Sequence, residues 1–277
     1  LKTAEMGRAR ALLARARADR GPGDLIVAGG PHPTARPRET LQAGVDAVVA
    51  GEGEVAFPDL LRRLLEGREW REAPNLRLLD GDRLVENPPA PLIALDDSRG
   101  VLERLGLIGP MEIARGCPWT CRYCQTPSLW ARVERQRTVA GAVRLARDYR
   151  VFIQFLSPNA LGYGAARPHA PDLEALTALL ESLRAARPDL RLNFGNFPSE
   201  VRPDYVTREA VALLRRMCDN RVLALGAQSG SPRLLKAIGR GHTADDVRRA
   251  VALAGEGGFA PYVDVIFGLP GETPETA

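Results

Sequence analysis

The sequence predicts an α/β protein built from two successive series of strand and helix units. In the first 86 residues, short apolar runs alternate with helical patterns, which is typical of a parallel sheet covered on both faces. A second series of strand-like runs begins at residue 111. Between the two series, the segment 87–91 reads Asn-Pro-Pro-Ala-Pro, and its prolines make it a stiff linker. We therefore expect one domain at residues 1–86, a linker at 87–110 and a second domain at 111–277.

The first series opens with a helix, because Ala9, Leu12, Leu13 and Ala16 recur at the spacing of one helical face. Glycine and proline near residue 22 end this helix. The elements expected after it are a strand at 25–28, a helix at 38–43, a strand at 47–50, a helix from 51 to about 65, and a hairpin formed by 76–79 and 83–85. These elements describe part of an open α/β sheet.

The second series contains five strand-like runs with helical patterns between them. The strands are expected at 111–114, 151–155, 190–194, 222–225 and 262–267. Helices are expected at 173–186 and 243–254, the latter capped by Thr243 with Asp246 three positions on. Repeated units of this kind close toward a barrel, and barrel proteins place their sites at the carboxyl ends of the strands.

The composition is that of an ordinary globular chain of 277 residues with a net charge of +4. All basic residues except Lys2 and Lys236 are arginine, which we interpret as a compositional bias. No basic block alternates with aromatic residues, so nucleic acid is not a favoured partner. No run approaches the roughly 18 apolar residues of a membrane span, and no signal peptide is visible. We expect a cytoplasmic protein and a sequence cut at both ends.

Three of the four cysteines, Cys117, Cys121 and Cys124, stand at C-x-x-x-C-x-x-C spacing directly after the strand expected at 111–114. A disulfide scaffold would be shorter and richer in cysteine. Structural zinc usually has four protein ligands, and Cys218 lies in an apolar helical run where a buried, small hydrophobic role is expected. Three thiolates on one loop instead suit a cubic 4Fe–4S cluster with one iron left open to a further ligand.

The cysteine segment resembles the signature of the radical S-adenosylmethionine (SAM) enzymes, with Tyr123 at the aromatic position before the last cysteine. The resemblance implies that the open iron binds the amino and carboxylate groups of SAM. It also implies that one electron splits SAM to methionine and a 5′-deoxyadenosyl radical. Such an enzyme needs a low-potential electron donor such as a flavodoxin or a ferredoxin. Cofactors of this type carry the difficult chemistry, and the protein supplies ligation and orientation.

The glycine pair Gly29 and Gly30, with the glycine-rich segment 51–54, resembles the second half of a cobalamin-binding domain. The family implied is that of cobalamin (B12)-binding-domain radical SAM proteins, and the resemblance covers residues 24–65 and 111–277. Its fold is a partial doubly wound (Rossmann-like) domain followed by a partial (βα)6-type radical SAM barrel. In that family the glycine pair lets the backbone approach the nucleotide tail of cobalamin. The cobalt-ligating motif D-x-H-x-x-G is absent, and His32, between two prolines, is expected to be a loop residue.

The remaining strand ends supply the residues that the resemblance assigns to SAM. Pro158 and Asn159 occupy the position that contacts the methionine amino group, and Gln228 lies in a Q-S-G-S turn with Ser231 capping the next helix. For Glu200 and Arg202 the alternatives are contacts to the ribose and carboxylate of SAM or a surface ion pair.

The last strand runs into the sequence G-L-P-G-E-T, the most specific signal after the cysteine triplet. There Ile266 is expected to press on the adenine of SAM, and Gly268 to allow close backbone approach. His169 and His242 are expected to be loop residues, and no catalytic side chain is assigned.

The function expected is that of a cobalamin-dependent radical SAM enzyme, with methyl transfer as its commonest chemistry. A tRNA methylthiotransferase is one alternative, against which stands the lack of cysteine in residues 1–116. A non-catalytic iron–sulfur module is an alternative of another class.

Overall fold

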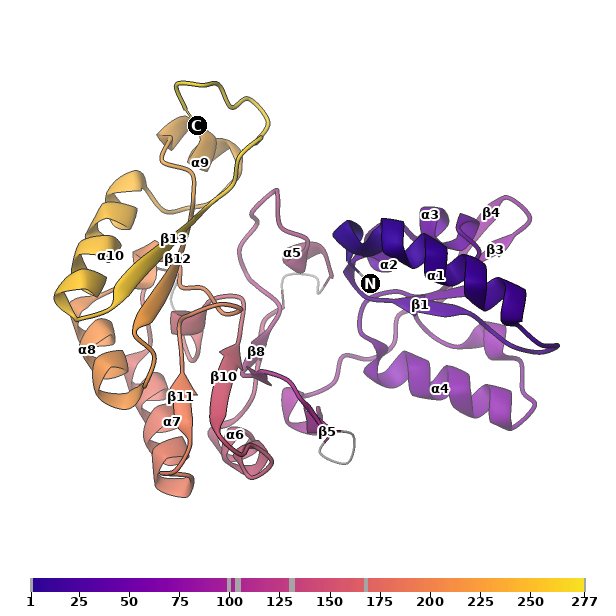
Figure 1. The fold of residues 1–277 in the computed structure, drawn as a ribbon, viewed down its shortest axis with the longest axis horizontal. Coiled ribbons are helices and arrows are strands. Elements are labelled where there is room, and N and C mark those ends of the chain that lie inside the picture. The colour runs from indigo at the N-terminus through magenta and orange to yellow at the C-terminus, as the bar shows by residue number, and fades with distance from the viewer. Residues whose placement is uncertain (1, 99–100, 103–105, 130–132, 167–168, 277) are drawn as a thin grey trace. The chain divides into compact units, whose positions relative to one another are not determined.

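The protein forms two compact units, Leu1–Ile93 and Ala94–Ala277, in a computed structural model. The structure describes residues 2–98, 101–102, 106–129, 133–166 and 169–276. Each unit has its own buried core, and each is described by itself below (Figure 1).

The first unit is a four-stranded sheet in the order β1-β2-β3-β4 with helices on both faces. β1 and β2 are parallel, whereas β3 and β4 run antiparallel to their neighbours. Its elements are η1 (Thr3–Glu5), α1 (Met6–Asp19), β1 (Val27–Gly29), α2 (Pro31–Ala35), α3 (Pro37–Gln42), β2 (Ala47–Val49), α4 (Gly53–Leu65), η2 (Trp70–Glu72), β3 (Leu76–Asp80) and β4 (Arg83–Glu86).

The buried strand β2 shows why both faces of this sheet must be covered. Successive side chains of a strand point to opposite faces. Ala47 and Val49 pack with Leu60 of α4, whereas Val48 packs with Leu41 of α3 and a residue of α1. The doubly wound arrangement predicted from the apolar strands is confirmed.

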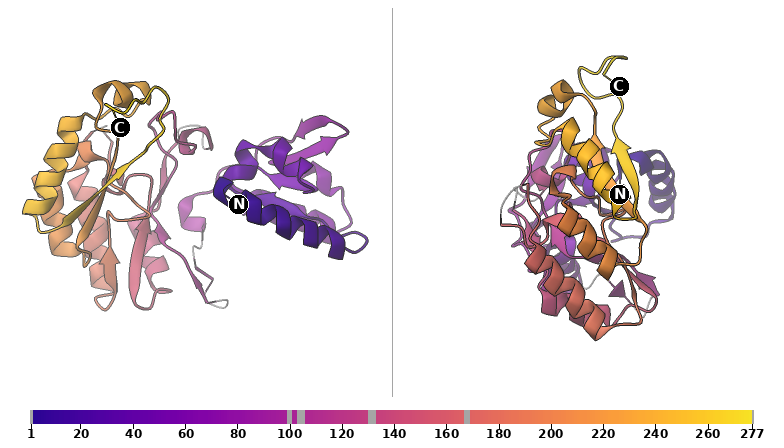
Figure 2. Two further views of the ribbon diagram at one scale, coloured as in Figure 1. Left: turned by 45° about the horizontal axis from the view of Figure 1, so that its top comes forward. Right: turned by 90° about the vertical axis from the view of Figure 1, so that its left-hand side faces the viewer.

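The second unit carries five parallel strands in chain order, with helices on their outer side (Figures 1 and 2). β7, β10 and β11 form one sheet and β12 pairs with β13, while a bridge from Val201 to Leu225 joins the two groups. The elements are η3 (Leu95–Asp97), β5 (Val101–Leu102), β6 (Leu107–Ile108), β7 (Met111–Glu112), β8 (Ala114–Arg115), α5 (Thr126–Leu129), β9 (Arg135–Gln136), α6 (Val139–Ala146), β10 (Phe152–Leu156), η5 (Ala160–Gly162), α7 (Leu173–Ala186), β11 (Arg191–Asn193), η6 (Pro203–Tyr205), α8 (Arg208–Met217), β12 (Val222–Gln228), α9 (Pro232–Ala237), α10 (Ala244–Glu256) and β13 (Ala260–Val265).

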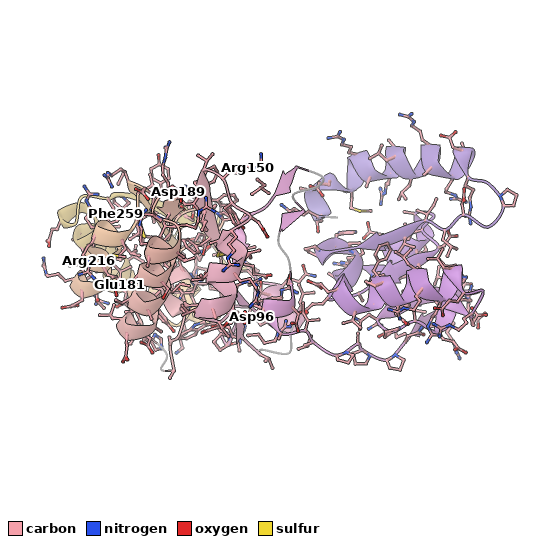
Figure 3. All side chains as sticks on the ribbon, turned by 90° about the horizontal axis from the view of Figure 1, so that it is seen from below. Asp96, Arg150, Glu181, Asp189, Arg216 and Phe259 are labelled. Atoms are coloured by element: carbon pink, nitrogen blue, oxygen red, sulfur yellow. The ribbon has the colours of Figure 1, made fainter. Side chains whose placement is uncertain are left out.

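The core of the second unit lies between these strands and the helices α6, α7, α8 and α10. Along α7 the buried positions are Leu176, Leu179, Leu180 and Leu183, the spacing of a single helical face. Outside the core, Glu181 of α7 lies 4.0 Å from Arg216 of α8 (Figure 3). Both side chains are exposed, so this pair adds little stability. The partial barrel predicted from the repeated strands is confirmed.

Most element ends agree with the prediction within one to two residues, but four local features differ. The strand expected at 222–225 extends to Gln228. The strand expected at 111–114 is divided, because Ile113 donates its N–H to Leu156 while its carbonyl accepts from Arg137. The chain thereby changes partner from β10 to β9. The last strand spans 260–265 rather than 262–267. His32 is not a loop residue: it lies buried in the short helix α2.

The proline-rich segment 87–91 belongs to the first unit, where the N–H of Asn75 donates to the carbonyl of Pro88 and its Oδ1 accepts from the N–H of Ala90. The chain passes into the second unit at Ala94, and Asp96 accepts hydrogen bonds from the N–H and the hydroxyl of Thr138 at the start of α6. The domain ends at 86 and 111 stay predictions. Among the described helices, none combines the length and the apolar character needed to cross a membrane.

Candidate functional site

The cysteine loop leaves the sheet directly after β8, at the carboxyl end of the first barrel strand. Arg115, the last residue of β8, forms two hydrogen bonds of 2.8 and 2.6 Å with the Glu112 carboxylate. Gly116 follows with φ of +89°, and a Cβ there would lie 1.9 Å from the carbonyl oxygen of Val133. Only glycine fits this turn, so the start of the loop is fixed by backbone packing.

The three thiols of the loop are free, with Cys121 buried and the other two half-buried. Burial raises the pKa of Cys117 to about 11, and the neighbouring Cys121, Glu134 and Cys124 act in the same direction. The ionised form of Cys117 is therefore disfavoured in this partly dry loop. A cation beside its sulfur would stabilise the thiolate, and an iron–sulfur cluster provides one.

Arg240 brings a positive charge to the cysteine loop from the segment after α9. One guanidinium nitrogen, Nη1, lies 3.7 Å from the sulfur of Cys121, and Nη2 donates to the carbonyl of Gly226 at 2.7 Å. The N–H of Arg122 donates to Ile238 and joins the same two segments. The sequence did not identify Arg240 as a site residue. Its contact with Cys121 joins residues more than a hundred positions apart and depends on the curvature of the barrel.

Glu200 and Gln228 meet Arg240 around Gly226 on β12. A Cβ on Gly226 would lie 2.8 Å from side-chain nitrogens of both Arg240 and Gln228 and 3.0 Å from Oε2 of Glu200. Gln228 is buried and has φ of +71°, a conformation that costs energy outside glycine and is frequent at functional sites. Burial, followed by the nearby Asp264 carboxylate, raises the pKa of Glu200, while Arg240 opposes that shift. A carboxylate, an amide and a guanidinium thus converge beside Cys121.

Arg202 does not form the surface ion pair considered from the sequence. Its side chain is buried, and Nη2 donates to Asp204 and to the carbonyl of Arg240, both at 3.0 Å. Its guanidinium lies 3.7 Å from the ring centre of Trp119, inside the cysteine loop. Two of its nitrogens, Nε and Nη1, lack a partner in the described part of the chain. A direct contact between Arg202 and SAM stays a prediction.

Pro158 and Asn159 follow β10 at the same end of the barrel. Pro158 is exposed, whereas Asn159 is buried and its Oδ1 accepts from the N–H of Arg202 at 3.1 Å. The next residue, Ala160, donates to the carbonyl of Glu200. In the structure, Asn159 therefore orients the segment that carries Glu200, and its contact with an amino group stays a prediction.

Tyr123 lies in the cysteine loop, and Ile266 and Gly268 follow the last strand, β13. Tyr123 is 37% exposed, and burial of its hydroxyl raises its pKa. Ile266 packs against Leu235, Ile238 and Leu269. Gly268 has φ of +80°, and a Cβ there would meet no described atom within 4 Å, so the backbone is open to a ligand. The roles assigned to these three residues stay predictions.

Gly29 and Gly30 line a cavity of about 530 Å³ in the first unit, at the carboxyl ends of β1 and β2. Gly51 and Gly53 line it from the other side. Gly30 and Gly51 have φ of +101° and +74°, and a Cβ at Gly51 would meet no protein atom within 4 Å. The absence of side chains leaves room for a bulky group beside the strand ends, which fits the nucleotide tail of cobalamin.

Thr34 and His32 support this cavity from α2. The hydroxyl of Thr34 donates to Gly30 and accepts from the N–H of Gly51 at 3.0 Å, which joins the two glycine loops. Nδ1 of His32 lies 3.0 Å from the hydroxyl of Thr3. Helix α2, which was not predicted from the sequence, therefore holds the shape of the cavity.

The donors at the barrel fit an iron–sulfur cluster by their chemistry. Three sulfur donors on one loop match the ligand set of such a cluster, and the adjacent Arg240 offsets part of their charge. Within residues 2–276 as described, no three His, Cys, Asp or Glu side chains are already gathered into a metal site. His169 and His242 lie in loops as predicted, and Cys218 is buried in the core at the end of α8.

Comparison with known proteins finds a family match in each unit. The family model described as the radical SAM superfamily matches residues 111–277, and that of the B12 binding domain matches residues 1–61. An uncharacterized methyltransferase of Pyrococcus horikoshii is 28% identical over 269 residues, which cover 91% of this chain and 55% of that protein. TokK of Streptomyces tokunonensis, a cobalamin-dependent radical SAM methyltransferase, is 28% identical over 92% of this chain and 40% of its own.

A solved structure shows the same fold. The radical SAM methyltransferase TsrM from Kitasatospora setae, with cobalamin and a [4Fe-4S] cluster bound, superposes with a TM-score of 0.74 at 22% identity. The match covers 98% of this chain and 54% of TsrM. The chain thus spans about half the length of the relatives it matches. Its cysteine loop, barrel and family match together show that the chain belongs to the radical SAM superfamily and carries a B12-binding domain.

Proposed function

We propose that this chain provides the cluster, SAM and cobalamin sites of a cobalamin-dependent radical SAM enzyme. Cys117, Cys121 and Cys124 would hold a 4Fe–4S cluster, which when bound and reduced would supply the one electron that cleaves SAM to methionine and a 5′-deoxyadenosyl radical. The observation that carries the proposal is the convergence of Glu200, Gln228 and Arg240 beside the cysteine loop. These groups of both charges would suit a zwitterionic ligand bound to the open iron.

The side chains around Gly226 provide the groups that SAM requires. Arg240 offers a fixed fork of donors suited to a carboxylate. The Glu200 carboxylate accepts, and the Gln228 amide donates and accepts, so both suit ribose hydroxyls. Asn159 keeps the Glu200 segment in place through the N–H of Arg202. Ile266 gives an apolar face for adenine.

Cobalamin is proposed to place its nucleotide tail in the glycine-lined cavity of the first unit. Gly29 and Gly30 let the tail approach the backbone, and Thr34 keeps the two loops of the cavity together. Methyl transfer is the reaction proposed, because the P. horikoshii relative and TokK are named methyltransferases. These names and the B12-binding match favour this function over a tRNA methylthiotransferase or a non-catalytic cluster module. No substrate is assigned.

The proposal extends to the electron donor and the compartment. A flavodoxin or ferredoxin would deliver electrons at the low potential that such clusters need. The free thiols and their oxygen-sensitive cluster suit the cytoplasm, where disulfides are rare. Neither nucleic acid nor a membrane is proposed as a partner.

The test is anaerobic reconstitution with iron and sulfide, followed by addition of dithionite and SAM. The expected product is 5′-deoxyadenosine, and Cys117→Ala is expected to abolish its formation. Cys218→Ala is the matched control, because Cys218 is buried in the core at the end of α8 and is expected to leave the product yield unchanged. Equal yields from wild type and Cys117→Ala would contradict the proposal. Binding of cobalamin is checked separately by its visible absorption after gel filtration.

A further inference from the structure

Trp119 is a loop residue whose side chain is unusually well held. It lies between Cys117 and Cys121, and the guanidinium of Arg202 stacks 3.7 Å from the centre of its ring. The imidazole of His169 meets the same indole edge-on, with ring centres 4.7 Å apart and planes at 71°. Gly241 closes a third side, since a Cβ there would lie 3.0 Å from Cζ3 of Trp119.

Asp204 ties the two groups that contact the indole. Its Oδ2 accepts from Nη2 of Arg202 at 3.0 Å and lies 2.5 Å from Nδ1 of His169. The side chains of Arg202 and Asp204 are only 3% and 5% exposed. A buried ion pair loses much of its hydration and often adds little net stability compared with apolar residues. Such a costly arrangement therefore calls for a role beyond holding the fold together.

A guanidinium held by two hydrogen bonds is suited to such a role. Through Nη2, Arg202 donates to Asp204 on η6 and to the carbonyl of Arg240, the residue that also reaches Cys121. These bonds hold the planar group against the indole. Cation–π contacts are strongest when, as here, the cation is desolvated.

We propose that Arg202 is a positioning residue for the cysteine loop: with Asp204 and His169 it clamps Trp119 and so fixes the segment between two cluster ligands. The proposal rests on the proposed function in one respect, namely that the loop binds a cluster. The clamp itself exists in the protein without a cluster, and its effect on the loop is measurable there.

The experiment compares variants of the whole chain, all in a Cys218→Ala background so that only the loop thiols react. The first readout is the rate at which a disulfide reagent modifies the thiols of the cluster-free protein. The second is the rate at which the reconstituted protein loses iron to a chelator. Trp119→Ala removes the ring and is expected to raise both rates about ten- to thirtyfold. Arg202→Lys keeps a cation but loses the planar stacking, so it is expected to raise both rates by a smaller factor. Trp119→Phe keeps an aromatic ring and is expected to stay close to the parent rates.

Two further variants separate positioning from simple stability. Arg184 is also tied to backbone carbonyls and to Asp219 in the same unit, so Arg184→Met is expected to lower the melting temperature and leave both rates unchanged. Arg202→Met combined with Asp204→Leu removes both buried charges, so it is expected to keep the fold and still to expose the thiols.

Parent-like rates in folded Trp119→Ala would overturn the clamp, and so would parent-like rates in the folded double variant. If Arg202→Lys does not fold, the comparison of Trp119→Ala with Trp119→Phe still tests the proposal. A parent protein that takes up no cluster would contradict the proposed function, while the thiol rates of the cluster-free variants would still decide the clamp.

Discussion

Gly116→Ala is expected to be among the most damaging single-methyl changes in the second unit. The new Cβ would stand 1.9 Å from the carbonyl oxygen of Val133 and 2.9 Å from its carbonyl carbon. Both are backbone atoms, so the clash cannot be relieved by a side-chain rotation. To reach an ordinary contact distance, the cysteine loop or the strand after Val133 must move by more than about 1 Å.

The magnitude has two parts. Alanine at a φ of +89° costs about 1 to 2 kcal/mol by itself. Displacing packed backbone adds overpacking strain of about 1 to 3 kcal/mol. A total near 3 kcal/mol corresponds to a fall of about 6 to 12 °C in the melting temperature of a unit of this size.

Gly258 of the same unit offers a matched control, with a φ of +79° and only the end of the Arg215 side chain, at 3.4 Å, within 4 Å of a Cβ. Gly258→Ala has the conformational cost without a backbone clash, so its free energy of unfolding should fall by only about 1 to 2 kcal/mol. The assay is thermal and urea unfolding of both variants, together with iron uptake on reconstitution. Equal losses of stability in the two variants, with normal iron uptake in Gly116→Ala, would refute the reasoning.

Three further predictions concern other parts of the second unit. Gly141→Ala would normally stabilise a helix by about 1 kcal/mol, but its Cβ would lie 2.1 Å from Oδ1 of Asp96. The variant is therefore expected to be destabilised by about 1 kcal/mol, because it displaces the carboxylate at the start of α6, and a rise in melting temperature would contradict this. Burial, with the cations Arg240 and Arg202 nearby, lowers the pKa of His242 to about 4. As the pH falls, His242 therefore takes up its proton in the unfolded chain before it does so in the folded protein. The free energy of unfolding is thus highest above about pH 6.5 and decreases toward pH 4, by up to about 3 kcal/mol. His242→Gln should flatten urea-unfolding stability over that pH range, and an unchanged pH dependence would contradict the assignment. Arg240→Met should raise the KM for SAM about ten- to hundredfold through loss of a charge-assisted hydrogen bond, and a wild-type KM would exclude the assigned contact.

The repeating strands and helices could be predicted from the sequence, because the spacing of apolar residues indicates which face of each element is buried. The run along α7 and the caps at Ser231 and Thr243 are local signals, and each is confirmed. The position of the cysteine triplet after the first barrel strand follows from spacing and strand order in the same way.

Contacts between distant loops could not be predicted from the sequence. Nothing near Arg240 indicates that it reaches Cys121, and nothing near Asp204 indicates that it joins His169 to Arg202. Such contacts depend on how the strand ends converge, which no local pattern records. The burial of His32 was missed for a related reason. Pro31 and Pro33 are typical of loops, but proline is also tolerated in the first turn of a helix.

The most direct test of the account is a magnetic resonance measurement on the reduced, reconstituted protein mixed with SAM labelled in its methionine amino and carboxylate groups. The account predicts a 4Fe–4S signal with hyperfine coupling to both labels, lost when Cys121 is replaced by alanine. A bound zinc ion without a paramagnetic cluster, or a cluster that shows no coupling to labelled SAM, would contradict it.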